Sequence, residues 1–163
     1  MRKTEVIKVA LVGNPNTGKS SLFNQLTGLN QKVSNYPGVT VEKKTGTAKL
    51  SRDVNATIID LPGTYSINPS SLDENIVLQA LLNAESEYPD VVVVVADVEN
   101  LKRNLFLFSQ IKDLEIPAIL VINMADQMKK KGISLNIDLL KKELNSEILL
   151  ISARKNLGID EVK

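Results

Sequence analysis

Short runs of apolar, mostly β-branched residues recur along the chain and predict the strands of a β-sheet. Five runs are almost continuously apolar, and they cover residues 6–12, 56–60, 91–97, 118–123 and 148–151. Such runs are typical of parallel strands that are covered on both faces. The segment 41–50 differs, because it alternates only weakly and is rich in Lys and Thr, so we predict an exposed antiparallel edge strand there.

Apolar residues at helical spacing predict helices between these strands. Two stretches show this spacing, one with Leu101, Leu105, Phe108 and Ile111, the other with Ile137, Leu140 and Leu144. A further helix is predicted to open at Ser71, where Glu74 can complete a capping box. This order predicts one α/β domain over residues 1–163, with a doubly wound, mostly parallel six-stranded sheet that includes one antiparallel edge strand. Ligands of such sheets bind at the carboxyl ends of the strands.

Two long stretches between these elements are rich in Gly, Pro, Asn and Ser and are predicted to be loops. They cover residues 28–40 and 61–71. Connections of this length within a compact domain are usually functional or mobile. The end of the chain is also unusual, because a helix is predicted to begin near Leu157 and the sequence stops at Lys163. We therefore expect a domain excised from a longer protein, with its last helix truncated.

The composition is typical of soluble globular domains. The 163 residues are 43% hydrophobic and 24% charged, and no apolar run approaches the roughly 20 residues that span a bilayer. A net charge of +1 argues against a surface built for nucleic acid, so no nucleic-acid partner is expected. The chain has no Cys and no His, which excludes disulfides, zinc–thiolate sites and imidazole catalysis. Any chemistry must therefore use hydroxyls, carboxylates, amides, Lys, Arg and bound ions.

Residues 13–20, with the sequence GNPNTGKS, match the phosphate-binding pattern G-x-x-x-x-G-K-[ST] between a predicted strand and a predicted helix. The glycines let the backbone curve so that successive N–H groups point at phosphate oxygens, and the helix N-terminus adds positive charge. Lys19 is expected to reach the β- and γ-phosphates, and the Ser20 hydroxyl to ligate Mg²⁺. The alternative is a Gly-rich turn that binds no ligand. The nucleotide contacts predicted here are Asn14, Asn16, Thr17, Gly18, Lys19, Ser20 and Ser21.

Two further elements are predicted on the phosphate side. Asp60 and Gly63 belong to a D-x-x-G element after a buried strand, where the carboxylate can hold Mg²⁺ and the Gly63 N–H can bind the γ-phosphate. Gly38, Val39 and Thr40 close the first long loop, and the Thr40 hydroxyl is expected to complete the Mg²⁺ shell when the γ-phosphate is bound. A loop with that dependence would be a switch. The alternatives are a plain Pro-Gly turn at Gly63 and a β-branched strand start at Thr40.

The base of the nucleotide is predicted to be guanine. Residues 123–126, with the sequence NMAD, follow a buried strand, and the Asp126 carboxylate can accept from both the ring N–H and the exocyclic amine of guanine. Adenine offers neither donor in that arrangement and would leave the carboxylate unpaired. Asn123 is expected to tie neighbouring loops together, and Met124 to lie against the base; the alternative for Asp126 is a helix N-cap. A backbone N–H for the guanine carbonyl oxygen is predicted from the segment Ser152, Ala153 and Arg154, with Ala153 expected to read the base.

In combination these motifs resemble the translation-factor-like class of small GTPases, and the resemblance covers essentially the whole chain. More narrowly, the segments GNPNTGKS, NYPGVTVE, DLPGTYS and NMAD are similar to those of the N-terminal G domain of the ferrous iron transport protein B family. That resemblance implies a Ras-like P-loop GTPase fold at the cytoplasmic face of the cell membrane, followed by a helical regulatory domain and a membrane permease for Fe²⁺. With no Cys or His the chain itself is a poor Fe²⁺ site, which favours regulation over conduction.

The resemblance also implies a bound monovalent cation. In related cation-activated GTPases an Asn at the position of Asn16 ligates K⁺ beside the phosphates and stabilises the charge that develops during hydrolysis. The residues expected to act in catalysis are therefore Lys19, Asn16 and Thr40. Backbone carbonyls around Asn35 and Tyr36 would complete the K⁺ shell. The alternative is that Asn16 is an ordinary loop amide.

These observations together predict a GTP-binding and slowly GTP-hydrolysing switch domain that regulates ferrous iron import, with Mg²⁺ and K⁺ as cofactors. Slow hydrolysis is expected because Thr64 stands where many GTPases carry a water-orienting Gln. One alternative is a ribosome-assembly or tRNA-modifying GTPase of the same fold. A second is a module that binds GTP or GDP without hydrolysing it, and an ATPase is the third. Assembly into a homo-oligomer is left open.

Overall fold

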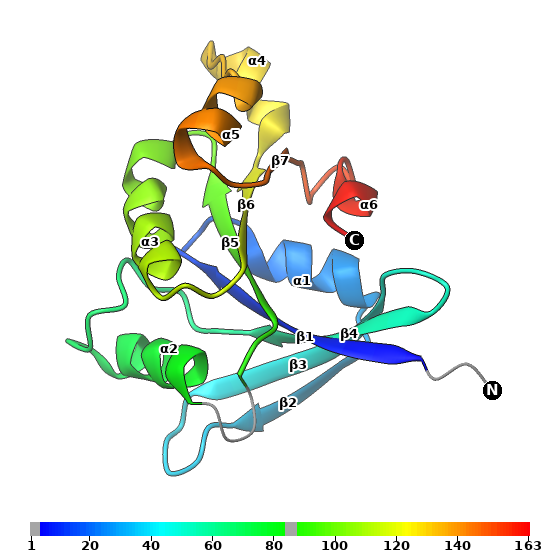
Figure 1. Ribbon diagram of the computed structural model, residues 1–163, viewed down its shortest axis with the longest axis vertical. Helices are drawn as coiled ribbons and strands as arrows, with labels where there is room; N and C mark the ends of the chain where they lie inside the picture. Colours follow the sequence, from blue (N-terminus) through cyan, green and yellow to red (C-terminus); the bar gives the residue numbers. More distant parts are fainter. Residues whose placement is uncertain (1–3, 84–87) are drawn as a thin grey trace.

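A β-sheet forms the centre of the computed structural model, which describes residues 4–83 and 88–163 (Figure 1). Within these residues the sheet has seven strands in the order β2-β3-β4-β1-β5-β6-β7. The strands are β1 (Glu5–Gly13), β2 (Gln31–Asn35), β3 (Glu42–Lys49), β4 (Val54–Asp60), β5 (Val91–Asp97), β6 (Ala118–Asn123) and β7 (Ile148–Leu150). β1 pairs in parallel with β4 and β5, and β6 pairs in parallel with β5 and β7. The predicted doubly wound, mostly parallel α/β sheet is confirmed.

The edge of the sheet beside β3 differs from the prediction. We predict six strands with residues 41–50 at the edge, whereas β3 pairs antiparallel with β4 on one side and with β2 on the other. β2 lies inside the segment 28–40, which the sequence predicts to be a loop. All five residues of β2 are exposed and Val33 is the single apolar one, so no hydrophobic pattern marks this strand. Its backbone pairing with β3 defines it instead.

Helices cover both faces of the sheet. The predicted helices lie close to their predicted positions, whereas the helical segment 125–131 was not predicted. They are α1 (Lys19–Thr27), α2 (Leu72–Leu82), α3 (Leu101–Asp113), α4 (Met128–Lys131), α5 (Ile137–Leu144) and α6 (Ile159–Val162), with a short 3₁₀ helix η1 (Ala125–Gln127). The predicted capping box opens α2, since the Glu74 N–H donates to Ser71 Oγ and the Ser71 N–H donates to the Glu74 carboxylate. In the part of the chain that is described, α3 is the longest helix with 13 residues, and none qualifies as a bilayer-spanning segment.

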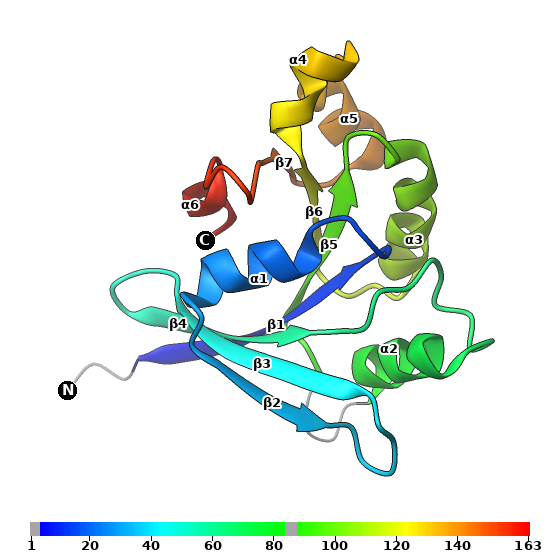
Figure 2. The same cartoon turned by 180° about the vertical axis from the view of Figure 1, so that it is seen from behind.

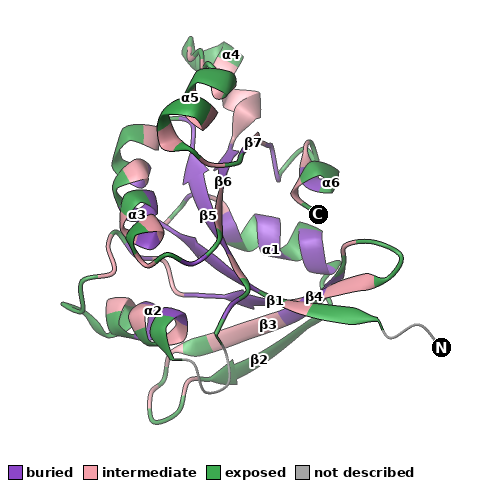
Figure 3. Ribbon diagram, in the orientation of Figure 1, coloured by how far each residue is buried: buried purple, intermediate pink, exposed green. Residues whose placement is uncertain are grey.

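Two hydrophobic clusters, one on each face of the sheet, hold these layers together. One cluster joins α2 and α3 to the sheet, and the other joins α1 and α6 to it. The strand β1 contributes alternately to both, because Ala10 and Val12 belong to the first cluster and Val9 and Leu11 to the second. Figure 3 shows the central strands as buried and β2 as exposed. This burial on two faces explains why the central strands have continuous apolar sequences.

The carboxyl ends of four neighbouring strands meet at one edge of the sheet. The register pairs Leu11 of β1 with Asp60 of β4, and Asp97 of β5 with Asn123 of β6. The motifs predicted to bind a nucleotide follow β1, β4 and β6, so the fold brings them to the same edge.

Candidate functional site

The segment between β1 and α1 curves around a cavity of about 310 Å³ that we call the cradle. Two glycines determine its shape. A Cβ at Gly13 would lie 2.7 Å from the Val95 backbone oxygen, and a Cβ at Gly18 would lie 2.2 Å from Asn123 Nδ2. Gly18 also has a φ of 82°, in the left-handed region where other residues are strained. The cradle is lined by Asn14, Pro15, Asn16, Gly18, Lys19, Ser20, Ser21 and Gly63.

Lys19 and Asp60 form a buried ion pair where the cradle meets the end of β4. Their side chains are in direct contact, and the residues are only 9% and 7% exposed. An ammonium group placed here attracts a phosphate, and a carboxylate attracts a metal cation. A metal–phosphate complex would engage both partners at once, so neither buried charge would be left without a counter-ion.

The residues at this point fit a magnesium ion. The Asp60 carboxylate is buried beside the cradle, and Ser20, which follows Lys19 in the first turn of α1, presents an exposed hydroxyl among the cradle residues. Carboxylate and hydroxyl oxygens are the hard ligands that Mg²⁺ prefers.

Gly63 faces the cradle from the loop that follows β4. A Cβ at Gly63 would lie 3.3 Å from Pro15 Cα, so the two backbones nearly touch. The next residue is fastened to β1, because the Thr64 N–H donates to the Gly13 oxygen at 3.0 Å. Thr64 is 3% exposed and its hydroxyl donates to the Ser66 oxygen at 2.6 Å. The hydroxyl that replaces the usual Gln is therefore engaged within its own loop.

Further along, the same loop is anchored to α3. The ring of Tyr65 stacks on the guanidinium group of Arg103, whose central carbon lies 4.0 Å from the ring centroid. The Ile67 N–H donates to Gln110 Oε1 at 3.1 Å. These two contacts hold the loop against α3.

Gly38, Val39 and Thr40 are not brought to the cradle. They lie in the connection between β2 and β3, which Figures 1 and 2 show beneath α2 and well away from the start of α1. Val39 lines a separate cavity of about 400 Å³ together with residues of α2, and Thr40 is exposed. Asn35 ends β2, which β3 and β4 separate from β1, so its carbonyl does not lie beside Asn16. The predicted roles of this loop in binding Mg²⁺, K⁺ and the γ-phosphate would therefore require the loop to move to the cradle.

Tyr36, in the same connection, is packed against the core of the domain. Its ring packs against the cluster under α2 and α3, and Lys43 Nζ lies 5.8 Å from the ring centroid. Its hydroxyl is buried without a hydrogen-bond partner among the described residues. Burial, and secondarily the negative charge of Asp60, raise the pKa of Tyr36 to about 12. The hydroxyl is thus close enough to Asp60 to experience its charge.

A second cavity of about 620 Å³ adjoins the cradle and collects every residue predicted to bind the base. The predicted lining residues are Gly18, Ser21, Asn123, Met124, Asp126, Ser152, Ala153 and Arg154. Four more lining residues fall outside the predictions: Asn24, Gln25, Glu99 and Gln127.

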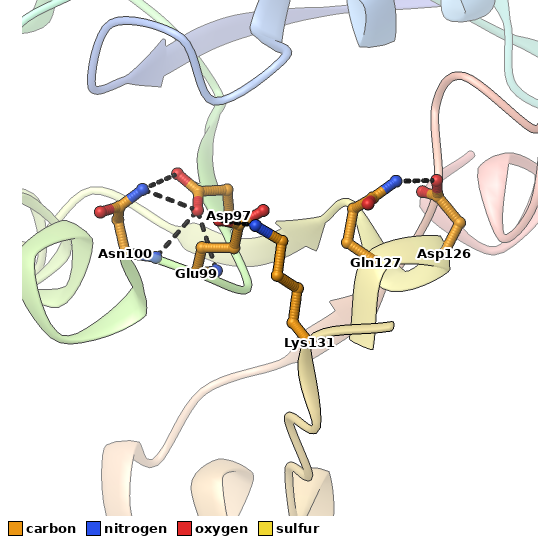
Figure 4. Close-up of polar contacts among 6 residues, drawn as sticks. All are labelled: Asp97, Glu99, Asn100, Asp126, Gln127 and Lys131. Carbon is orange, nitrogen blue, oxygen red and sulfur yellow. Dashed lines mark hydrogen bonds and ion pairs between the residues drawn. The ribbon is translucent and has the colours of Figure 1, made fainter. Parts of the chain in front are cut away.

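Asp126 presents its carboxylate in this base cavity. Ser152 Oγ donates to one carboxylate oxygen at 2.6 Å. Gln127 Nε2 donates to the other at 2.7 Å (Figure 4). The Ser152 hydrogen bond is the main cause that lowers the pKa of Asp126, so the group is held ionised. Each oxygen keeps a further lone pair for a ligand. Asp126 lies inside η1, whose N-cap is Met124, so the helix N-cap alternative does not describe it.

Asn123 joins the cradle to the base cavity. Its Nδ2 donates to the Thr17 oxygen at 3.0 Å, and its Oδ1 accepts from the Ala153 N–H at 2.9 Å. This is the tie between loops that the sequence predicts. It also engages the Ala153 N–H, and the Ser152 N–H donates to the Leu157 oxygen. Arg154 therefore provides the one backbone N–H of residues 152–154 without a partner among the described residues.

Glu99 illustrates how an unpredicted lining residue could have been found. It follows the carboxyl end of β5, where Asp97 Oδ1 accepts from the N–H groups of Glu99 and Asn100, both at 2.9 Å. Its carboxylate pairs with Lys131 at 3.4 Å (Figure 4). The same reasoning from strand ends that identified Asp60 and the base motif applies to β5. Gln25 has no such signal, since it lies within α1 and donates to the Ala153 oxygen at 3.1 Å.

Comparison with known sequences relates this chain to one protein family. The sequence profile of the family described as ferrous iron transport protein B matches residues 7–163. The Fe(2+) transporter FeoB of Leptospira biflexa is 45% identical over 155 residues, which are 95% of this chain and 22% of that protein. The Fe(2+) transporter FeoB of Escherichia coli K12 is 40% identical over 161 residues, 96% of this chain and 20% of that protein. The chain thus spans about a fifth of the length of these relatives.

Solved structures agree with the sequence comparison. The G domain of the T. maritima FeoB iron transporter superposes with a TM-score of 0.88 at 40% identity, covering 97% of this chain and 94% of that chain. A point mutant of S. thermophilus NFeoB bound to GDP superposes with a TM-score of 0.87 at 42% identity, covering 96% of this chain and 59% of that chain. The fold is that of a P-loop GTPase.

Proposed function

Because the chain belongs to the ferrous iron transport protein B family, we propose that it is the GTP-binding and GTP-hydrolysing switch domain of a longer membrane protein that imports Fe²⁺. In this proposal residues 1–163 form one G domain at the cytoplasmic face of the membrane, followed by a helical regulatory domain and a permease. Asn123 carries the proposal, since one buried amide holds the phosphate cradle and the base cavity in a fixed relation.

Guanine fits the donors and acceptors of the base cavity. The ionised Asp126 carboxylate accepts from the ring N–H and the exocyclic amine of guanine. The unpartnered Arg154 N–H donates to the guanine carbonyl oxygen. The sequence favoured Ala153 for this role, but the Ala153 N–H already donates to Asn123 Oδ1. Adenine would oppose its own acceptor nitrogen to the carboxylate, which would then lack the two donors that guanine provides.

The phosphates fit the cradle. The backbone N–H groups between Gly13 and Lys19 and the N-terminus of α1 bind the phosphate oxygens, and Lys19 turns from Asp60 to the β- and γ-phosphates. Asp60 and Ser20 would then hold Mg²⁺, with Thr40 added when the first loop rearranges. Bound Mg²⁺ supplies positive charge that offsets the charge of the phosphate oxygens. The exposed amide of Asn16 is the ligand that this chain offers to K⁺.

Hydrolysis proceeds by attack of water on the γ-phosphorus, which breaks its bond to the β–γ bridging oxygen and yields GDP and inorganic phosphate. Lys19 and the cradle N–H groups stabilise the charge that moves onto the leaving oxygen. We expect a slow rate, because the Thr64 hydroxyl donates to Ser66 and does not orient the water. The same observation favours one alternative, a module that binds GTP or GDP without hydrolysing it.

Hydrolysis of GTP in KCl and in NaCl at equal ionic strength tests the proposal. GTP turnover that K⁺ stimulates, and that loses the stimulation in Asn16→Ala, is the expected result. Asn136→Ala is the matched control, because this Asn caps α5 and lines neither cavity. Near-zero rates in both salts with tight GDP binding would establish the binding-only alternative. Faster hydrolysis of ATP than of GTP would refute guanine recognition.

The transport part of the proposal needs the full-length protein. Cells that lack their own ferrous importer and express this protein should accumulate Fe²⁺, and Asp126→Ala should reduce that uptake by weakening guanine binding. Uptake that is unchanged in Asp126→Ala, at equal protein level, would separate this domain from iron import.

A further inference from the structure

Asn14 has the largest unmet hydrogen-bonding capacity in the described part of the chain. The residue is 3% exposed, yet neither Nδ2 nor Oδ1 has a partner among the described residues. Within the same residues the Tyr36 hydroxyl is the one other buried side-chain atom in this condition. Proteins leave few buried polar groups unpaired, because such a group has lost its hydrogen bonds to water without replacing them. We therefore expect the Asn14 amide to find hydrogen-bond partners in another conformational state of the protein.

The direction of β1 indicates where that partner lies. Ala10 and Val12 face the cluster under α2 and α3, whereas a Cβ at Gly13 would meet Val95 and Thr17 instead. Asn14 directly follows β1, and continuing the alternation by one residue places it on the face of Ala10 and Val12. The loop that follows β4 covers this face, since Leu61 belongs to the same cluster.

The backbone of this loop passes directly beside Asn14. The Thr64 N–H donates to the oxygen of Gly13, the residue before Asn14, at 3.0 Å. The residue after Asn14 is Pro15, whose Cα would lie 3.3 Å from a Cβ at Gly63. Asn14 is thus bracketed by the two contacts that hold Gly63 and Thr64 against the cradle.

We propose that Asn14 is a positioning residue for the γ-phosphate: in the GTP-bound state its amide exchanges hydrogen bonds with the backbone of Gly63 and Thr64 and keeps the Gly63 N–H on that phosphate. The inference rests on the proposed function, in which Gly63 binds the γ-phosphate. When Gly63 moves toward the γ-phosphate, the Thr64 peptide moves relative to Gly13, so its present hydrogen bond to the Gly13 oxygen changes. A carboxamide suits the new pairing because it offers both a donor and an acceptor. Asn14 acts through this backbone, and with GDP its amide stays unpaired.

The test compares the affinities for GDP and for a GTP analogue with an NH group between the β- and γ-phosphates. In Asn14→Leu, which has a similar volume and no polar atoms, affinity for the analogue should fall at least tenfold relative to GDP. The dissociation constant for GDP should change by a smaller factor than that for the analogue, because GDP has no γ-phosphate for Gly63 to bind. The urea midpoint of the GDP-bound variant should be equal or higher, because two unpaired polar atoms are removed. Asn136→Ala, the matched control, should lower the midpoint and leave the affinity ratio unchanged.

Two results would overturn the inference. One is an unchanged ratio of the two affinities in Asn14→Leu. The other is an equal loss of both affinities with a lowered midpoint, which is what a purely structural amide would give. If Asn14→Leu does not fold, Asn14→Ala carries the same test. The test measures affinities and needs no hydrolysis, so it remains decisive if the chain binds nucleotides without hydrolysing them. If the parent protein binds neither GDP nor the analogue, the proposed function is refuted, and the inference fails with it.

Discussion

Replacing Asn123 with Ala should lower both the stability of the fold and the affinity for guanine nucleotides. The Asn123 amide makes two hydrogen bonds, at 3.0 Å to the Thr17 oxygen and at 2.9 Å from the Ala153 N–H. All three residues are at most 4% exposed, so water cannot replace the lost amide. Each buried group left unpaired costs about 1–3 kcal/mol, and partial relaxation brings the sum to about 2–4 kcal/mol. For a chain of this length that is a fall in Tm of roughly 5–15 °C.

Urea unfolding without nucleotide measures the first effect, and titration with fluorescent GDP measures the second. The affinity for GDP should fall about 100-fold, equivalent to about 2.7 kcal/mol. The reason is that the Asn123 side chain no longer holds the cradle segment and residues 152–154 in a fixed relation. Asn136→Ala is again the control, with a loss of about 1 kcal/mol at a helix N-cap and no change in GDP binding. An Asn123→Ala protein that loses no more stability than this control, or binds GDP as the parent does, would show that the two segments hold their positions independently.

Two pKa shifts give further predictions. Ser152→Ala should raise the pKa of Asp126 toward its ordinary value, since the main cause of its lowering is removed; carbon NMR of the carboxyl group checks this, and an unmoved pKa would contradict it. Tyr36→Phe should remove part of the fall in stability between pH 10 and about 12. Over that range the unfolded tyrosine ionises while the buried one stays protonated, which favours unfolding. Parallel slopes of urea midpoint against pH for Tyr36→Phe and the parent would exclude this contribution.

The central strands could be predicted from the sequence because burial on two faces leaves a continuous apolar run. The predicted runs 91–97 and 118–123 coincide with β5 and β6. β2 could not be predicted, since all its side chains are exposed and its existence depends on backbone pairing with β3. Hydrophobic pattern reports burial, so a strand without buried residues is invisible to it.

Within the site, the sequence predicted best those positions where a residue type fixes the backbone. Gly13 and Gly18 are required by close contacts with Val95 and Asn123, and the pattern that contains them identified the cradle. The sequence gives no comparable information for Thr40, because packing of the loop against α2 determines where that residue lies. It likewise could not indicate which N–H of residues 152–154 is available, since hydrogen bonds within the folded chain decide that.

The spacing between the phosphate and base determinants follows from the sheet rather than from the loops. The cradle follows β1 and the base motif follows β6, with β5 between them. Two strand spacings are about 10 Å, which is comparable to the span of the ribose between the α-phosphate and the base. In the proposed complex with a guanine nucleotide, β5 would therefore end beneath the sugar. Glu99, which follows β5, lines the base cavity. Because hydrogen bonds between strands set this distance, loop substitutions can change what each motif binds without changing how far apart the motifs stand. Asn123, at the end of β6, is bonded to Thr17 in the segment that curves around the cradle, and it adds a direct constraint to the spacing that the sheet provides.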